Sequence, residues 1–101
     1  MRLLLWTNHS RAKMRQYKLS ESRVKRVLNR PERVEEGIAD KTVTLMQPAG
    51  TAKHPYEIWV MAQDTAKRRK VISAWRYPGK TKPGEPLPER IMREFREASK
   101  F

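Results

Sequence analysis

The stretch KVISAWRYPG, residues 70–79, decides the fold together with YEIWVMAQ, residues 56–63. Both segments are rich in β-branched and aromatic residues, and the polar connector DTAKRR is short, so they predict an antiparallel hairpin. Strict alternation of side chains gives each strand one aliphatic face, with Ile58, Val60, Ala62, Ile72 and Ala74. The opposite face carries Glu57, Trp59, Met61, Gln63, Val71, Ser73, Trp75 and Tyr77. This second face suits either a core layer or a half-open surface that accepts stacked bases.

The rest of the chain predicts further short elements around this hairpin. We expect a strand at residues 2–6, a helix from His9 or Ser10 to about Lys18 with Thr7, Asn8 or Ser10 as the N-cap, and a helix from Ser20 to Asn29. The acidic segment 32–41 indicates turns, TVTLMQ at residues 42–47 a strand, and PAGTAKHP at residues 48–55 a loop.

After the hairpin, the proline-rich run PGKTKPGEPLP predicts a tether, and residues 88–100 predict a last helix. The order is therefore β-α-α-β-β-β-α. We expect an α+β fold with a helical pair packed on an antiparallel sheet. We assign one domain to residues 1–79 and the tether with its C-terminal helix to residues 80–101.

The charge of the chain is strongly positive. It has 23 Lys and Arg against 11 Asp and Glu among 101 residues, which gives a net charge of +12. Through Arg30 there are nine basic residues and a single acid, Glu21. Such a balance favours a polyanionic partner, and nucleic acid is the first candidate.

Several function classes are disfavoured by the composition. The chain has no cysteine, which excludes disulfides and thiolate metal sites. We expect no metal and no cofactor. The first apolar run, residues 3–6, is too short for a signal peptide or a membrane span, so we expect a cytoplasmic protein that does not enter the membrane.

The run HSRAKMRQYKLSESRVKRVLNRPERVEEG, residues 9–37, resembles a small uncharacterised prokaryotic domain family related to RelE- and ParE-type toxins. The segments YEIWVM and KVISAWRYPG resemble the last two strands of that family. The resemblance covers residues 7–78, and Tyr17 departs from it because the family pattern has Arg there. It implies the RelE-like fold of microbial ribonucleases and metal-independent cleavage of RNA, with RNA or the ribosome as target and an acidic antitoxin-like protein as a further partner.

Such cleavage needs a base for the 2′-hydroxyl proton, a cation for the phosphorane oxygens and an acid for the leaving 5′-oxygen. His9 is the candidate acid or base, since an imidazole changes charge near neutral pH. Arg76 and Lys13 are the candidate cations, and Lys13 shares a helix face with His9. The alternatives are a surface or capping role for His9 and a cross-strand ion pair between Arg76 and Glu57.

The candidate nucleic-acid contacts fall into two chemical groups. The basic group would bind phosphates and comprises Arg11, Arg15, Lys67, Arg68, Arg69 and Lys70. The aromatic group would stack on bases and comprises Trp59, Trp75 and Tyr77. The alternatives are a solvated hairpin tip at residues 67–70 and aromatic side chains that belong to the core.

Three function classes remain open from the sequence. The first is a toxin-like endoribonuclease that acts on mRNA or at the ribosome, and the second is a non-catalytic basic module that binds nucleic acid or the ribosome. The third is a structural or protein-partner module, such as an antitoxin-neutralised or ribosome-associated factor. A helix-turn-helix at residues 9–30 that binds DNA belongs to the second class. The second helix has few side chains that read base edges, which counts against that form.

Overall fold

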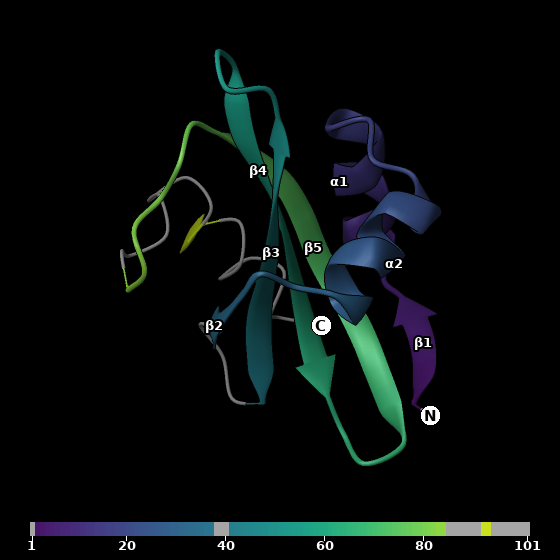
Figure 1. Cartoon of the computed structure of the whole chain (residues 1–101). Coiled ribbons are helices and arrows are strands. Elements are labelled where there is room, and N and C mark those ends of the chain that lie inside the picture. The colour runs from purple at the N-terminus through teal and green to yellow at the C-terminus, as the bar shows by residue number, and fades with distance from the viewer. Residues whose placement is uncertain (1, 38–40, 85–91, 94–101) are drawn as a thin grey trace.

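The computed structural model describes residues 2–37, 41–84 and 92–93. It is an α+β fold in which two helices lie against one face of a five-stranded mixed sheet (Figure 1). The elements follow in the order β1 (Leu3–Trp6), α1 (Asn8–Gln16), α2 (Glu21–Asn29), β2 (Arg33–Glu36), β3 (Thr42–Gly50), β4 (Pro55–Asp64) and β5 (Arg68–Pro78). The α+β class is confirmed. The predicted order is wrong within the described residues, because an additional strand, β2, precedes β3.

The strands lie in the order β1-β5-β4-β3-β2. The β1 strand pairs with β5 in parallel, whereas all the other pairs are antiparallel, so the prediction of an antiparallel sheet is wrong. A parallel pair requires a crossover connection, and helices α1 and α2 lie within the long connection between β1 and the hairpin strands. The sequence 48–50, predicted as part of a loop, continues strand β3.

The hairpin of β4 and β5 is present as predicted, but one β-bulge changes the faces of its second strand. Val60 pairs with Ala74 and Met61 with Ser73, and the next pair joins Ala62 to Val71. Ile72 is therefore the extra residue on β5. A bulge of this kind reverses the alternation that follows from a period of two. As a result Val71 joins the helix-facing core and Ile72 joins the aromatic face, the reverse of the prediction.

Each face of the sheet carries a buried layer. The helix-facing layer packs Val24, Val27 and Leu28 of α2 on Ile58, Val60, Ala62, Val71 and Ala74 of the hairpin. The opposite layer comprises Met46, Trp59, Met61, Ile72 and Trp75. Trp59 and Trp75 are neighbours across β4 and β5, and their ring centroids lie 6.0 Å apart at an interplanar angle of 4°. Their face is thus a second core layer, one of the two alternatives that the sequence left open.

The two helices begin and end where local chemistry predicts. Thr7 and Ser20 are the N-caps, and their side chains accept hydrogen bonds from the backbone N–H of Ser10 and Arg23. Helix α1 ends without glycine. The N–H of Leu19 bonds to the carbonyl of Met14 at 2.8 Å, and Lys18 takes a left-handed conformation with φ 56°. This turn directs the chain from α1 into α2.

The segment after β5 is fastened to the aromatic face by a buried carboxylate. Glu57 is 3% exposed, and it accepts hydrogen bonds from Trp59 Nε1 at 3.0 Å, Thr81 Oγ1 at 2.7 Å and Thr81 N at 3.1 Å. Glu57 therefore does not pair with Arg76, and that alternative is wrong. Arg33 also holds this segment, because its guanidinium donates to the carbonyls of Thr81 and Lys82. The predicted C-terminal helix lies outside the described residues except for Met92 and Arg93, which are helical.

Candidate nucleic-acid interface

Arg76 lies on β5 at the junction between the sheet and the helix pair. Its Nε donates to the carbonyl of Tyr17 at 2.7 Å and its Nη2 to the carbonyl of Lys18 at 3.2 Å. The guanidinium also lies over the ring of Tyr56, with its Cζ atom 5.0 Å from the ring centroid. Arg76 thus ties β5 to the end of α1, and its position is fixed on two sides.

A second arginine is directed toward the same region by the register of the sheet. Gln47 and Arg76 both pair with Ile58, so the three residues form a row across β3, β4 and β5, with Gln47 and Arg76 roughly 10 Å apart. Arg23 of α2 donates to the side-chain oxygen of Gln47. Gln47 in turn donates to the carbonyls of Arg26 and Arg30 at 3.0 and 2.7 Å, which holds it against α2.

We call Arg23, Arg26 and Arg76 the arginine cluster. Burial lowers the pKa of Arg23 below its usual value, and the positive charges of Arg26 and Arg76 lower the pKa further. The nearby Tyr56 acts in the opposite direction. No carboxylate among the described residues forms an ion pair with these three arginines. The fold therefore brings three positive charges together. Arg23 and Arg76 are half-buried and Arg26 is exposed, and no acidic partner among the described residues neutralises them.

The cluster lies at one end of the sheet. The connection between α1 and α2 and the hairpin between β3 and β4 are both at the top of the molecule in the view of Figure 1. The strands of that hairpin end at Gly50 and Pro55. Lys18 and Arg30, whose backbone carbonyls bind Arg76 and Gln47, have exposed side chains, and so has Arg15 on α1.

The structure does not bring His9 to Arg76. His9 is the second residue of α1, whereas Arg76 binds the carbonyl of Tyr17, which directly follows the helix. Eight residues of helix separate the two positions by roughly 12 Å. Lys13 lies between them and donates to the side chain of Gln16 at 3.0 Å. His9 and Lys13 lie on α1, whereas Arg76 reaches the end of that helix from β5, so the three predicted catalytic residues do not surround one phosphate.

The two predicted phosphate contacts on α1 are both exposed. Arg11 forms an ion pair with Glu21 at 3.1 Å, and its Cζ atom lies 5.7 Å from the ring centroid of Trp6. No ion pair joins Arg15 to any carboxylate of the described residues. The charge of Arg11 is therefore partly neutralised by Glu21, whereas no acid among the described residues neutralises the charge of Arg15.

The basic hairpin tip lies at the other end of the sheet, at the bottom of Figure 1. Arg68 and Arg76 are eight residues apart on β5, or roughly 26 Å in an extended strand. Arg69 forms a bidentate pair with Asp64, at 2.8 and 2.9 Å. Lys67, Arg68 and Lys70 are exposed. The predicted basic residues thus occupy two separate regions.

The aromatic side chains lie on the face opposite to the arginine cluster. Trp59 and Trp75 are 2% and 1% exposed, and Tyr77 is half-buried against the same layer. Base stacking needs an open ring face. In this structure the two indoles stack on each other inside the core, so neither ring is available to a base.

Arg23 and Arg26 of the cluster, and the neighbouring Tyr56, were not predicted from the sequence as site residues. Arg23 lies four residues before the buried Val27, so it borders the apolar stripe of α2, and this position was the available signal. Tyr56 begins the predicted hairpin strand, but nothing in the sequence indicates its contact with Arg76, which lies 20 positions further along the chain.

Within the described residues, no group of three His, Asp or Glu side chains is placed to hold a metal ion. In the same ranges, no helix has the length and apolar character needed to cross a membrane. Comparisons with protein families, with curated proteins and with solved structures gave no match.

Proposed function

We propose that the protein binds RNA through its phosphates, with the arginine cluster as the central contact. The observation that supports this proposal is the convergence of Arg23, Arg26 and Arg76 without an acidic partner among the described residues. Like charges that are brought together and partly buried destabilise the isolated protein. An anion bound between them relieves that repulsion.

The chemistry of the cluster favours direct hydrogen bonds to a phosphate group over loosely associated counterions. A guanidinium presents a planar set of donors that matches two oxygens of one phosphate. Arg23 and Arg76 are already oriented by Gln47 and by the carbonyls of Tyr17 and Lys18. Because these side chains are held in place, less conformational entropy is lost when an anion binds.

The surroundings of the cluster favour a polymeric anion. Arg15, Lys18 and Arg30 are exposed on the same helical half. These positions extend the positive surface beyond the size of one phosphate. We therefore expect contacts with several consecutive phosphates and little readout of base sequence, because most protein contacts to phosphates carry no sequence information.

RNA cleavage is a second candidate function, and Tyr56 is the observation that favours it. Its ring lies under Arg76, so a phenol that can exchange a proton lies beside cations that can hold a phosphate. His9 and Lys13 do not share that position. The cleavage hypothesis therefore makes Tyr56 the acid that protonates the leaving 5′-oxygen, with solvent water taking the 2′-hydroxyl proton, and assigns phosphorane stabilisation to Arg23 and Arg76.

Binding is tested with a fluorescein-labelled single-stranded RNA of about 20 nucleotides at low salt, by fluorescence anisotropy. The double variant Arg23→Gln/Arg26→Gln should raise the Kd by about tenfold or more, since two charged contacts are lost. Lys67→Gln/Lys70→Gln removes the same charge at the opposite end of the sheet and should raise it only about twofold. Equal effects of the two double variants would show that charge acts diffusely, and the proposed site would be wrong.

The same RNA tests cleavage on a denaturing gel. Cleavage by the wild type that disappears in Tyr56→Phe would support the second candidate. RNA that stays intact while it binds would refute the cleavage hypothesis and leave the binding function unaffected.

A further inference from the structure

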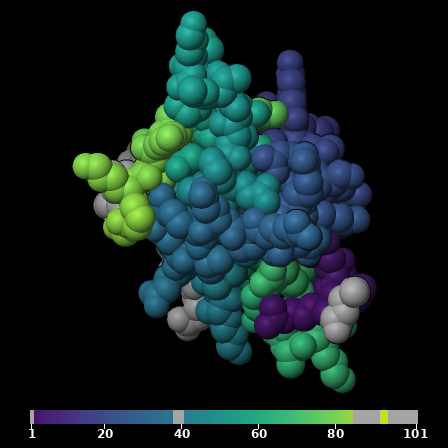
Figure 2. Space-filling model, in the orientation of Figure 1, coloured from purple at the N-terminus to yellow at the C-terminus, as the bar shows by residue number. Residues whose placement is uncertain are grey.

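A groove between β1 and α2 lies away from the arginine cluster. It has a volume of about 820 Å³ and is lined by Arg2, Leu3, Leu4, Lys25, Leu28, Asn29 and Arg69. The space-filling view shows a recess between the purple atoms of β1, the blue atoms of α2 and the green atoms of β5 (Figure 2). Its size is that of a site for a ligand or for a few residues of a peptide.

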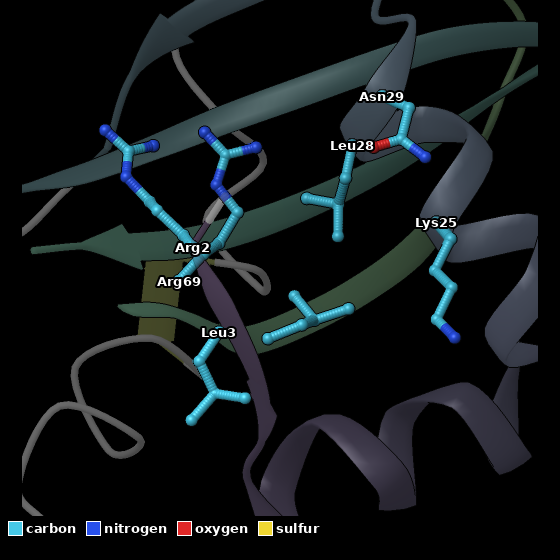
Figure 3. A pocket seen from close by; sticks show the side chains of 7 residues that line it. Arg2, Leu3, Lys25, Leu28, Asn29 and Arg69 are labelled. Carbon is cyan, nitrogen blue, oxygen red and sulfur yellow. The ribbon is translucent and has the colours of Figure 1, made fainter. Parts of the chain in front are cut away.

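The walls and the floor of the groove differ in chemistry. Figure 3 shows the guanidinium groups of Arg2 and Arg69 together on one side and the ammonium group of Lys25 on the other, with Leu28 between the two sides. Leu4 pairs with Arg69 in the sheet, so the two side chains lie on the same face of the sheet. A ligand for this groove therefore needs negative charge at its edges and an apolar group at its centre.

The positive charge of the groove is only partly neutralised. Asp64 pairs with Arg69 at 2.8 Å and with Arg2 at 3.2 Å. Among the described residues, Lys25 has no ion pair. One carboxylate thus faces three cations. The side chain of Arg2 is 45% exposed, which leaves donors on its guanidinium for an incoming carboxylate.

The rim of the groove also exposes apolar surface. Leu3 is 59% exposed and is one of two large hydrophobic residues that are exposed among the described positions. It lies on β1, which is an edge strand that pairs with β5 on one side only. An edge strand offers backbone donors and acceptors to an extended chain. A peptide along β1 would cover Leu3 and would place side chains in the groove.

We propose that the groove between β1 and α2 binds an acidic peptide segment of another protein, in which aliphatic residues alternate with carboxylates. Aliphatic side chains of the peptide contact Leu4 and Leu28, and its carboxylates bind Arg2 and Lys25. RNA fits these features less well, because its polar backbone leaves the leucines uncovered and the lining residues include no aromatic ring on which a base can stack. This inference does not depend on the proposed RNA-binding function.

The probe is a fluorescein-labelled peptide of eight alternating glutamate and leucine residues, with a peptide of eight glutamates as the control for charge. The wild type should bind the alternating peptide more tightly than the all-glutamate peptide, although the latter carries more negative charge. Lys25→Glu and Leu3→Asp should each weaken that binding by roughly fivefold or more. Both positions are exposed, so both variants should fold, and circular dichroism checks this.

Lys53→Glu is the matched control, since it makes the same charge change at an exposed position outside the groove. It should weaken peptide binding by less than about twofold. The proposal is overturned if the all-glutamate peptide binds as tightly as the alternating one, or if Lys53→Glu acts as strongly as Lys25→Glu. It is also overturned if the alternating peptide shows no saturable binding up to about 1 mM. Loss of RNA binding in Leu3→Asp, with peptide binding unchanged, would assign the groove to RNA.

Discussion

Replacement of Glu57 by Gln should test whether one buried carboxylate fastens the segment after β5. Glu57 is 3% exposed and receives three hydrogen bonds, one from the indole of Trp59 and two from Thr81. Its Oε2 also lies 4.0 Å from Nη1 of Arg33. Gln preserves the shape of the side chain but replaces one acceptor oxygen by an NH₂ donor. Whichever way the amide is oriented, a donor then faces another donor.

The structure sets the size of the effect. If the amide oxygen takes the place of Oε1, it keeps the bonds from Trp59 and from the Thr81 hydroxyl, and the bond from the Thr81 N–H at 3.1 Å is lost. The two remaining bonds lose their charge-assisted character, and Arg33 loses a nearby anion. A buried hydrogen bond to a charged group contributes about 1.5–3 kcal/mol. We expect Glu57→Gln to reduce the free energy of unfolding by about 2–3 kcal/mol.

Urea unfolding followed by circular dichroism and by tryptophan fluorescence measures this change. Glu36→Gln is the matched control, because Glu36 is exposed and should change stability by less than about 0.5 kcal/mol. Hydrogen exchange of the Thr81 amide should accelerate in Glu57→Gln and not in the control. A Glu57→Gln protein as stable as the wild type would refute the argument that these hydrogen bonds hold the segment.

Three further predictions concern single positions. Lys18→Gly should stabilise the protein by about 0.5–1 kcal/mol in urea unfolding, since Lys18 has a φ of 56° at the end of α1, and a loss of stability would contradict this. Gly50→Ala should destabilise it by more than about 1 kcal/mol, because the new Cβ would lie 2.3 Å from the carbonyl oxygen of His54, and an unchanged midpoint would refute the clash. Hydrogen bonds from Arg69 hold the pKa of Asp64 below its usual value. The ionised carboxylate therefore stabilises the fold above pH about 4, and this stabilisation is lost as the pH falls through the folded-state pKa. On acidification, Asp64→Asn should lose less free energy of unfolding than the wild type. Equal losses in the two proteins would contradict the stabilising role of the Asp64 carboxylate.

The parts of the fold that were predicted correctly depend on interactions near in sequence. Thr7 and Ser20 cap their helices by binding the N–H three residues later, and the hairpin follows from the composition of its two strands. The strand β2 was missed because its one apolar residue, Val34, is 56% exposed, so hydrophobic alternation carries no signal there.

The errors arise from interactions that are distant in sequence. The parallel pairing of β1 with β5 joins Leu3 to Arg68 and leaves no mark on either segment. The bulge at Ile72 exchanges the faces of two adjacent apolar residues, which both suit a buried strand. Neither feature changes the local composition, so only the three-dimensional pairing of the strands shows it.

The candidate site was predicted in part. Arg76 was identified as a cation, but its contact with the carbonyl of Tyr17 spans 59 positions and could not be inferred from the sequence. Arg23 was missed because basic residues are frequent on both helices, and its position beside the apolar stripe of α2 was the one sequence signal that distinguishes it. His9 was predicted to act on the same phosphate as Arg76, but His9 lies at the start of α1 and Arg76 binds the carbonyl that follows its end.

The salt dependence of RNA binding tests the central claim most directly. The Kd for a single-stranded RNA is measured at several salt concentrations between about 50 and 250 mM. Three arginine contacts to phosphates predict that the logarithm of the binding constant falls with the logarithm of salt with a slope of about −2 or steeper, at about −0.7 for each phosphate. The Arg23→Gln/Arg26→Gln protein should show a slope flatter by about 1.4. A wild-type slope close to zero, or the same slope in both proteins, would contradict phosphate binding by the arginine cluster.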